Sequence, residues 1–208
     1  MADQITQWIE AIVTLPIFLP LVTIMAFLDA TIPVIPSEPV LSVGASWAGA
    51  TGQINPWHVF FAALIGGMAG DNTCYIVGRK FQNKVANLNP KSKPGKAIGW
   101  VRRMMKHYGG ATIIIARFVP YARFTLTLLL GSVRYNWLLF FIYDTIGVAI
   151  WAGAIVSVSY FGGLLFEGAP LIGVLFGVVA GTLIGVVIQK IQNSVIEWRA
   201  ERRATSSA

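Results

Sequence analysis

The chain has 208 residues and a formal net charge of +7, with 55% apolar residues but only 12% charged ones. Ordinary globular domains contain about 25% charged residues, so a soluble protein of this composition could not cover its surface. These values exclude a typical soluble enzyme. The length suits a single membrane domain over residues 1–208, without a separate soluble domain.

The first two apolar stretches differ in their prolines. Residues 9–28 are long enough to cross about 30 Å of hydrocarbon as a helix, and no signal-peptide pattern precedes them. Residues 31–50 open with Pro33, Pro36 and Pro39. Each proline removes a backbone donor and disfavours helix before it, so we expect a re-entrant hairpin instead of a straight crossing.

The third stretch, 57–77, predicts a spanning helix with a polar stripe. Asp71, Tyr75 and Arg79 follow one another at intervals of four residues, so they share one helix face over two turns. The stripe could support a polar cavity. Alternatively, Arg79 reaches to the membrane interface and Asp71 is an acid used in helix packing.

The positive charge is concentrated in two segments. No Lys or Arg precedes residue 79, whereas the loop 79–107 carries nine and no acid, and the tail 190–208 carries four more. A basic loop could bind nucleic acid, but between apolar stretches it favours a cytoplasmic position. We expect both segments in the cytoplasm, where they would also attract anionic lipid headgroups.

The second broken stretch, 111–132, carries Pro120 between Arg117 and Arg123. We expect another re-entrant hairpin here. On a straight helix, residues six apart point about 240° apart around the axis. A break at the proline lets the two arginines converge.

Two further stretches, 137–160 and 169–188, are apolar enough to span. The predicted fold is an all-α polytopic membrane protein with about four transmembrane helices and two re-entrant helical hairpins. With the basic loop in the cytoplasm, the hairpins enter from opposite faces, which is the inverted-repeat plan of many transporters. Both termini are then cytoplasmic.

Glycines recur at every fourth position in the last stretch, at Gly173, Gly177, Gly181 and Gly185. Small residues at this spacing let helices approach closely. The face could form a homodimer, although packing within one chain is the simpler interpretation.

Charged residues flank both breaks. Asp29 and Glu38 lie on either side of the first, and Arg117 and Arg123 on either side of the second. Ionisable groups are costly inside a membrane, so each is a candidate functional residue. Arginines grip phosphate, and buried carboxylates suit proton exchange. Alternatively, the four charges pair with one another and pin the hairpins together. Both interpretations can hold, because an anionic headgroup can displace a resting ion pair.

The same residues lie in ordered motifs, which together resemble those of the DedA family over residues 27–163. The segments are FLD at 27–29 with IPSE at 35–38, GDNTCYIVGR at 70–79, and RFVPYAR at 117–123. Asp29 stands where the family usually has Glu, and Ser37 where it usually has Gly. Neither change argues against the family.

The resemblance implies a lipid transporter of the cytoplasmic membrane. Bacterial members are linked to the return of undecaprenyl phosphate, the carrier lipid of envelope synthesis, and to the proton motive force. By this resemblance, Arg117 and Arg123 would hold the phosphate, while Asp29 and Glu38 would exchange protons or gate the arginines. Related eukaryotic proteins scramble phospholipids.

Three other functions remain open. A non-selective phospholipid scramblase would share the fold, and a proton-coupled exporter of small solutes or cations would use the acids more than the arginines. An enzyme is not expected, because the sequence offers no nucleophile–base arrangement and no metal-ligand cluster. Cys74 is the only cysteine, which excludes an internal disulfide. We expect no cofactor and no nucleic-acid partner.

Overall fold

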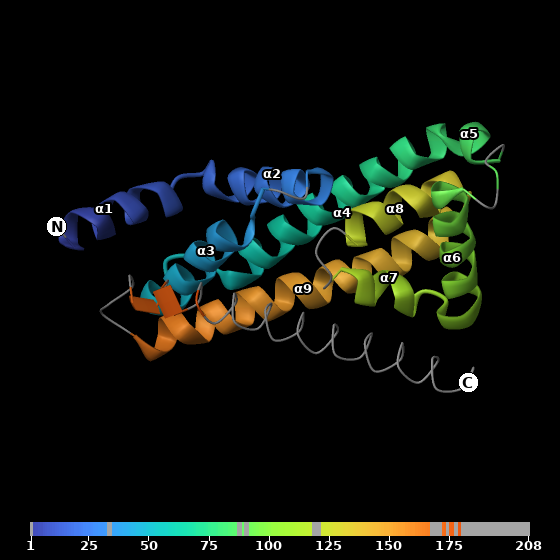
Figure 1. Cartoon of the computed structure of the whole chain (residues 1–208). Helices are drawn as coiled ribbons and strands as arrows, with labels where there is room; N and C mark the ends of the chain where they lie inside the picture. Colours follow the sequence, from blue (N-terminus) through green and yellow to red (C-terminus); the bar gives the residue numbers. More distant parts are fainter. Residues whose placement is uncertain are drawn as a thin grey trace.

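The structure is a computed structural model that describes residues 2–32, 35–86, 89, 92–117, 122–166, 172, 173, 175, 176 and 179. Regular secondary structure in these residues is entirely helical, which confirms the expected all-α class (Figure 1). The helices are α1 Ala2–Val13, α2 Phe18–Thr31, α3 Glu38–Thr51, α4 Pro56–Lys80, α5 Gln82–Ala86, α6 Lys93–Tyr108, α7 Ala111–Ala116, α8 Ala122–Ser132 and α9 Trp137–Leu165.

Two of these helices, α4 and α9, are long and apolar enough to cross a membrane, as the sequence predicts for residues 57–77 and 137–160. Each begins at an asparagine whose side chain accepts a hydrogen bond from a backbone amide of the first turn. Asn55 caps α4 through the Trp57 amide, and Asn136 caps α9 through the Leu139 amide. Such caps fix where each span starts. The two helices pack against each other through the middle of the molecule.

The stretch 9–28 is not one straight helix, and its crossing of a membrane stays a prediction. Helix α1 ends at Val13, α2 begins at Phe18, and their axes are bent by 83°. Pro16 lies in the intervening turn, where it removes a donor and disfavours helix at the preceding residue. Helix α2 is therefore one arm of the first hairpin and packs along α4.

The bend also changes the position of the N-terminus. Helix α1 lies at the end of the molecule opposite to α5 and α6, which carry the basic loop (Figure 1). The cytoplasmic position of the N-terminus stays a prediction.

Two helical hairpins approach each other from opposite ends of the molecule (Figure 1). In the first, α2 packs on α4 and α3 packs mainly on α9. In the second, α8 packs on α4 and α7 packs on α9. The breaks fall where the sequence predicts them, although Pro33 and Pro120 lie outside the described residues. A re-entrant position of the hairpins in a membrane stays a prediction.

The loop 79–107 folds mainly into two helices at one end of the molecule. Helix α6 is capped by the Ser92 hydroxyl, which accepts a hydrogen bond of 3.2 Å from the Gly95 amide. Its buried side is apolar and includes Val101, while Arg102 and Lys106 are exposed. This end is the basic end of the molecule.

The C-terminal predictions lie largely beyond the described residues. These include the tail 190–208, most of the span 169–188, and the glycines at 177, 181 and 185. Gly173 is described and lies beside Gly163 of α9, within the same chain. That contact agrees with packing inside one chain. The homodimer face stays a prediction.

Helices α3 and α9 approach so closely that glycine is required at their crossing. A Cβ atom on Gly163 would overlap the Ser46 carbonyl oxygen, and one on Gly49 would overlap the Tyr160 carbonyl oxygen. Backbone atoms cannot rotate away from such an overlap. This crossing ties the first hairpin to the second long helix.

We expect Gly163→Ala to lower the melting temperature of the purified protein, because overpacking of this kind costs about 1–3 kcal/mol. Gly153→Ala is the matched control on the same helix, since its Cβ would lie 3.7 Å from the Phe60 ring in ordinary contact. The control should be neutral or stabilising, by up to about 1 kcal/mol. Thermal unfolding in detergent measures both, and equal melting temperatures would contradict the close crossing.

Candidate functional site

The acidic residues of the two long helices lie between two apolar clusters. One cluster includes Ala63 of α4 and Ala152 of α9, and the other includes Tyr75 and Phe140. Along α4, Asp71 falls between the two clusters, and along α9, Asp144 does so. The sequence thus places one acid on each long helix, between the two clusters.

Arg117 connects these two acids. It follows the last residue of α7, and its Nη2 donates to the Asp71 carboxylate and, over 3.1 Å, to Asp144 Oδ1. The three side chains are 2%, 0% and 4% exposed. The sequence predicted Arg117 as a site residue, but it did not identify Asp144 as its partner. The available signal was an isolated aspartate inside a long apolar stretch.

This buried triad does not satisfy every polar atom. Arg117 Nη1, Asp71 Oδ1 and Asp144 Oδ2 are buried, and none has a hydrogen-bond partner among the residues that the structure describes. Two carboxylates share one guanidinium. Such a cluster is costly to break but has spare capacity for a proton or a polar ligand.

Arg123 joins the tips of the two hairpins. Its Nη2 donates to the Asp29 backbone carbonyl over 2.6 Å and lies 3.5 Å from Asp29 Oδ1. The Ser37 hydroxyl donates to Asp29 Oδ2 over 3.1 Å, so Ser37 orients the carboxylate. The side chains of Arg123 and Asp29 are 14% and 15% exposed, which is more open than the Arg117 triad. The predicted pairing across the hairpins is therefore seen for one arginine.

Glu38 is the first residue of α3 and is exposed. It lies close enough to Asp29 and Arg123 to interact with their charges, but it makes no ion pair with any described residue. Pro36, two positions earlier, is also exposed in the break. The structure thus places Asp29, Glu38 and Arg123 together. Arg117 makes its ion pairs with Asp71 and Asp144, but it lies close enough to Asp29 for their charges to interact.

The predicted polar stripe on α4 divides into three environments. Asp71 belongs to the buried triad. The Tyr75 hydroxyl donates to the Tyr135 carbonyl, and its ring stacks on Phe140 at 4.8 Å between centroids. Arg79 is exposed at the basic end. Arg79 and Tyr75 fit the packing interpretation of the stripe, whereas Asp71 belongs to the charged centre.

Chemically, the centre holds four carboxylates and two guanidinium groups: Asp29, Glu38, Asp71, Asp144, Arg117 and Arg123. Acids are therefore in excess, and the arrangement suits proton exchange together with anion binding at the more open arginine. Within the described parts of the chain, no group of three His, Cys, Asp or Glu residues could hold a metal ion.

Comparison with known proteins assigns the family. Residues 32–161, more than half of the chain, match the model of the VTT domain. The chain belongs to the VTT-domain, or DedA, family. It is 27% identical to Protein DedA of Escherichia coli strain K12 over 178 residues, which cover 85% of this chain and 78% of that protein.

Other relatives of this DedA-family chain carry membrane-protein names. It is 25% identical over 166 residues to an uncharacterized membrane protein of Mycobacterium tuberculosis, covering 74% of this chain and 76% of the relative. It is 31% identical over 141 residues to one of Synechocystis, covering 66% and 63%. No solved structure matches the chain. With its apolar helices, the chain is a membrane protein.

We expect Arg117→Leu to destabilise the protein by about 3–5 kcal/mol, because it leaves two buried carboxylates without a counter-charge. Adding Asp71→Asn and Asp144→Asn should restore much of that stability, since the uncompensated charge is then gone. Arg102→Leu, at an exposed position of α6, is the control and should change little. Melting temperatures in detergent measure all three. An Arg117→Leu protein as stable as the control would contradict the triad.

Proposed function

We propose that this protein moves a polyprenyl phosphate carrier lipid, undecaprenyl phosphate, across the cytoplasmic membrane. One observation carries the proposal: a partly open arginine, Arg123 near the start of α8, bonds to Asp29 near the end of α2 and so joins the two hairpins. Arginine matches phosphate in charge and in hydrogen-bond geometry. Family membership supports a role in membrane transport.

The position of Arg123 suits a headgroup that must pass the middle of the membrane. A phosphate bare in hydrocarbon would cost many kcal/mol, whereas a polar path spares it that cost. The phosphate would take the place of the Asp29 carboxylate, which lies 3.5 Å from the guanidinium. The hydrocarbon chain would stay outside this path. With hairpins entering from opposite faces, each leaflet can reach the same arginine.

Asp29 and Glu38 would couple this exchange to protons. When Asp29 is ionised it competes with the phosphate for Arg123, and when it is protonated it releases the arginine. Glu38 is exposed beside this pair and has no ion-pair partner among the described residues. It is therefore placed to pass protons to Asp29.

Arg117 would act as a positioning residue in the state seen here. Two carboxylates already occupy its guanidinium, so a phosphate could bind there only against their repulsion. By holding the end of α7 to α4 and α9, it fixes the hairpin that carries Arg123. We further propose that the protein is not an enzyme and that its basic end faces the cytoplasm.

We expect Arg123→Ala to slow transport by about 10- to 100-fold, because a hydrogen bond to a charged group is worth about 1.5–3 kcal/mol. Arg123→Lys keeps the positive charge but loses the two-pronged hydrogen bonding of the guanidinium, so its transport rate should lie between those of Arg123→Ala and wild type. Proteoliposomes with labelled undecaprenyl phosphate, with and without a pH gradient, measure headgroup movement. The control is Arg102→Ala, which removes an exposed arginine of α6.

The same measurement separates the other functions. Equal movement of phosphatidylcholine without a gradient would make the protein a scramblase. No movement of either lipid under any gradient would favour an exporter of small solutes. If an Arg123→Ala variant that inserts normally transports the lipid at the wild-type rate, Arg123 does not bind the phosphate during transport.

We expect Glu38→Gln to keep movement of the lipid down its own gradient while losing acceleration by a pH gradient, because the amide cannot carry a proton. Glu10→Gln is the control, since Glu10 lies on α1 and bonds to Gln53 far from the centre. Flux measured against the size of the pH gradient tests this. An unchanged gradient dependence in Glu38→Gln would assign proton coupling elsewhere.

A further inference from the structure

A largely apolar groove of about 440 Å³ lies between the end of α2, helices α4 and α5, and α8. It is lined by Thr31, Thr73, Cys74, Val77, Gly78, Phe81, Val85, Phe124, Leu128, Leu129 and Ser132. Several of these side chains, including Val77, are exposed. In a spanning protein, such side chains face the lipid.

The depth of the groove follows from the close approach of α4 and α8. A Cβ atom on Gly78 would overlap the Leu128 carbonyl oxygen, and one on Gly131 would overlap the Tyr75 carbonyl oxygen. With no side chain at either position, the two backbones touch and form a floor. The larger side chains on both sides of this line form the walls.

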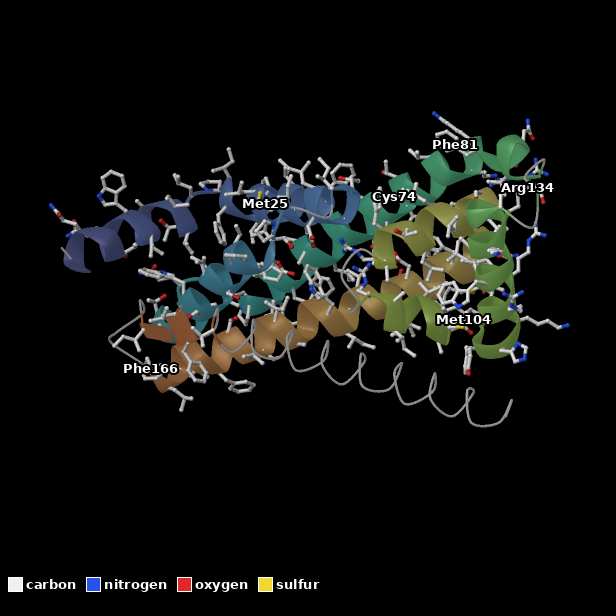
Figure 2. The ribbon with its side chains drawn as sticks, in the orientation of Figure 1. Met25, Cys74, Phe81, Met104, Arg134 and Phe166 are labelled. Atoms are coloured by element: carbon white, nitrogen blue, oxygen red, sulfur yellow. The ribbon has the colours of Figure 1, made fainter. Side chains whose placement is uncertain are left out.

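The groove connects the candidate site with the basic end. Thr31 lies two residues after Asp29, and Phe124 directly follows Arg123, so one end of the groove lies beside the hairpin contact. At the other end is Phe81, near Arg134 and α5 (Figure 2). Cys74 lies between them, near the middle of the molecule (Figure 2). From Thr73 to Phe81 the helix rises about 12 Å.

An apolar groove of this kind cannot shelter a phosphate, which would lose its hydration there without gaining hydrogen bonds. It suits a hydrocarbon chain. Its volume takes a segment of such a chain. A polyprenyl phosphate has one chain to place, whereas a diacyl phospholipid has two.

We infer that this groove binds the prenyl chain of the lipid phosphate while the phosphate lies at Arg123. The inference rests on the proposed function and adds a binding site for the chain. A lipid that enters from the end opposite α5 and α6 extends its chain ahead of its headgroup. When the phosphate reaches the centre, the chain lies beside α4 and α8 in the half nearer the basic end. The groove occupies that half.

Photo-crosslinking tests the groove without relying on transport. The full-length protein in liposomes is irradiated with a polyprenyl monophosphate that carries a diazirine on its chain, and crosslinked peptides are mapped by mass spectrometry. We expect crosslinks to concentrate in 73–81 and 124–132. Val77→Trp and Thr73→Trp, two separate fillings of the groove, should each reduce these crosslinks about tenfold, by excluding about two methylene groups.

Ile76→Trp is the matched control. Ile76 is next to Val77 on α4 and exposed, but it lines a separate, more open hollow of about 470 Å³ with Trp137 of α9, which does not reach Arg123 or α8. This variant should crosslink like wild type. Crosslinks spread evenly over α4, α8 and the lipid-facing side of α9, or groove crosslinks that survive in properly inserted Val77→Trp and Thr73→Trp, would overturn the inference. Equal labelling of the groove by a diazirine-bearing diacyl phosphatidylglycerol would overturn the single-chain occupant.

Transport of the same variants separates this inference from the proposed function. If wild type moves the lipid but crosslinks elsewhere, the function stands and the groove assignment fails. If the chain crosslinks in the groove but no lipid moves under any gradient, the groove assignment is supported and the proposed transport function is contradicted. If both hold, Val77→Trp should slow transport about tenfold relative to Ile76→Trp.

Discussion

The structure depends on one buried guanidinium that is shared by two carboxylates. Arg117 cannot lie inside this apolar protein unless acids surround it, and the acids come from the two long helices, α4 and α9. The triad therefore fixes the spacing of these helices and anchors the second hairpin at its break.

Two arginines from one short motif thus have different chemical roles because their partners differ. Arg117 has two carboxylates and almost no exposure, so its interactions stabilise the fold. Arg123 has one distant carboxylate and one backbone carbonyl, so an incoming anion has less to displace. The carbonyl bond of 2.6 Å holds the guanidinium in place while the carboxylate exchanges. A polar group whose hydrogen-bonding capacity is only partly used is typical of a binding site, whereas in a protein core it costs stability.

Much of this arrangement follows from the sequence. The prolines among apolar residues predicted both breaks, and the charged residues beside them predicted the candidate site. The pairing did not follow, because which acid meets Arg117 depends on helix packing that no local pattern encodes. Asp144 was visible only as an isolated charge between residues 137 and 160. The bend within residues 9–28 was missed because their length and apolarity were judged without the effect of Pro16.

The Arg117 triad and the contact between Arg123 and Asp29 also differ in whether they must separate during transport. The Arg117 triad ties α7 to the long helices, so it belongs to the part of the molecule that stays fixed. The contact between Arg123 and Asp29 is the one described ion pair that joins the two hairpins directly. Opening the centre toward either end therefore needs this contact to separate. A phosphate that replaces the Asp29 carboxylate at Arg123 weakens the contact while it binds. In the mechanism proposed above, ligand binding thus favours opening, which also breaks the hydrogen bond from Arg123 to the Asp29 carbonyl.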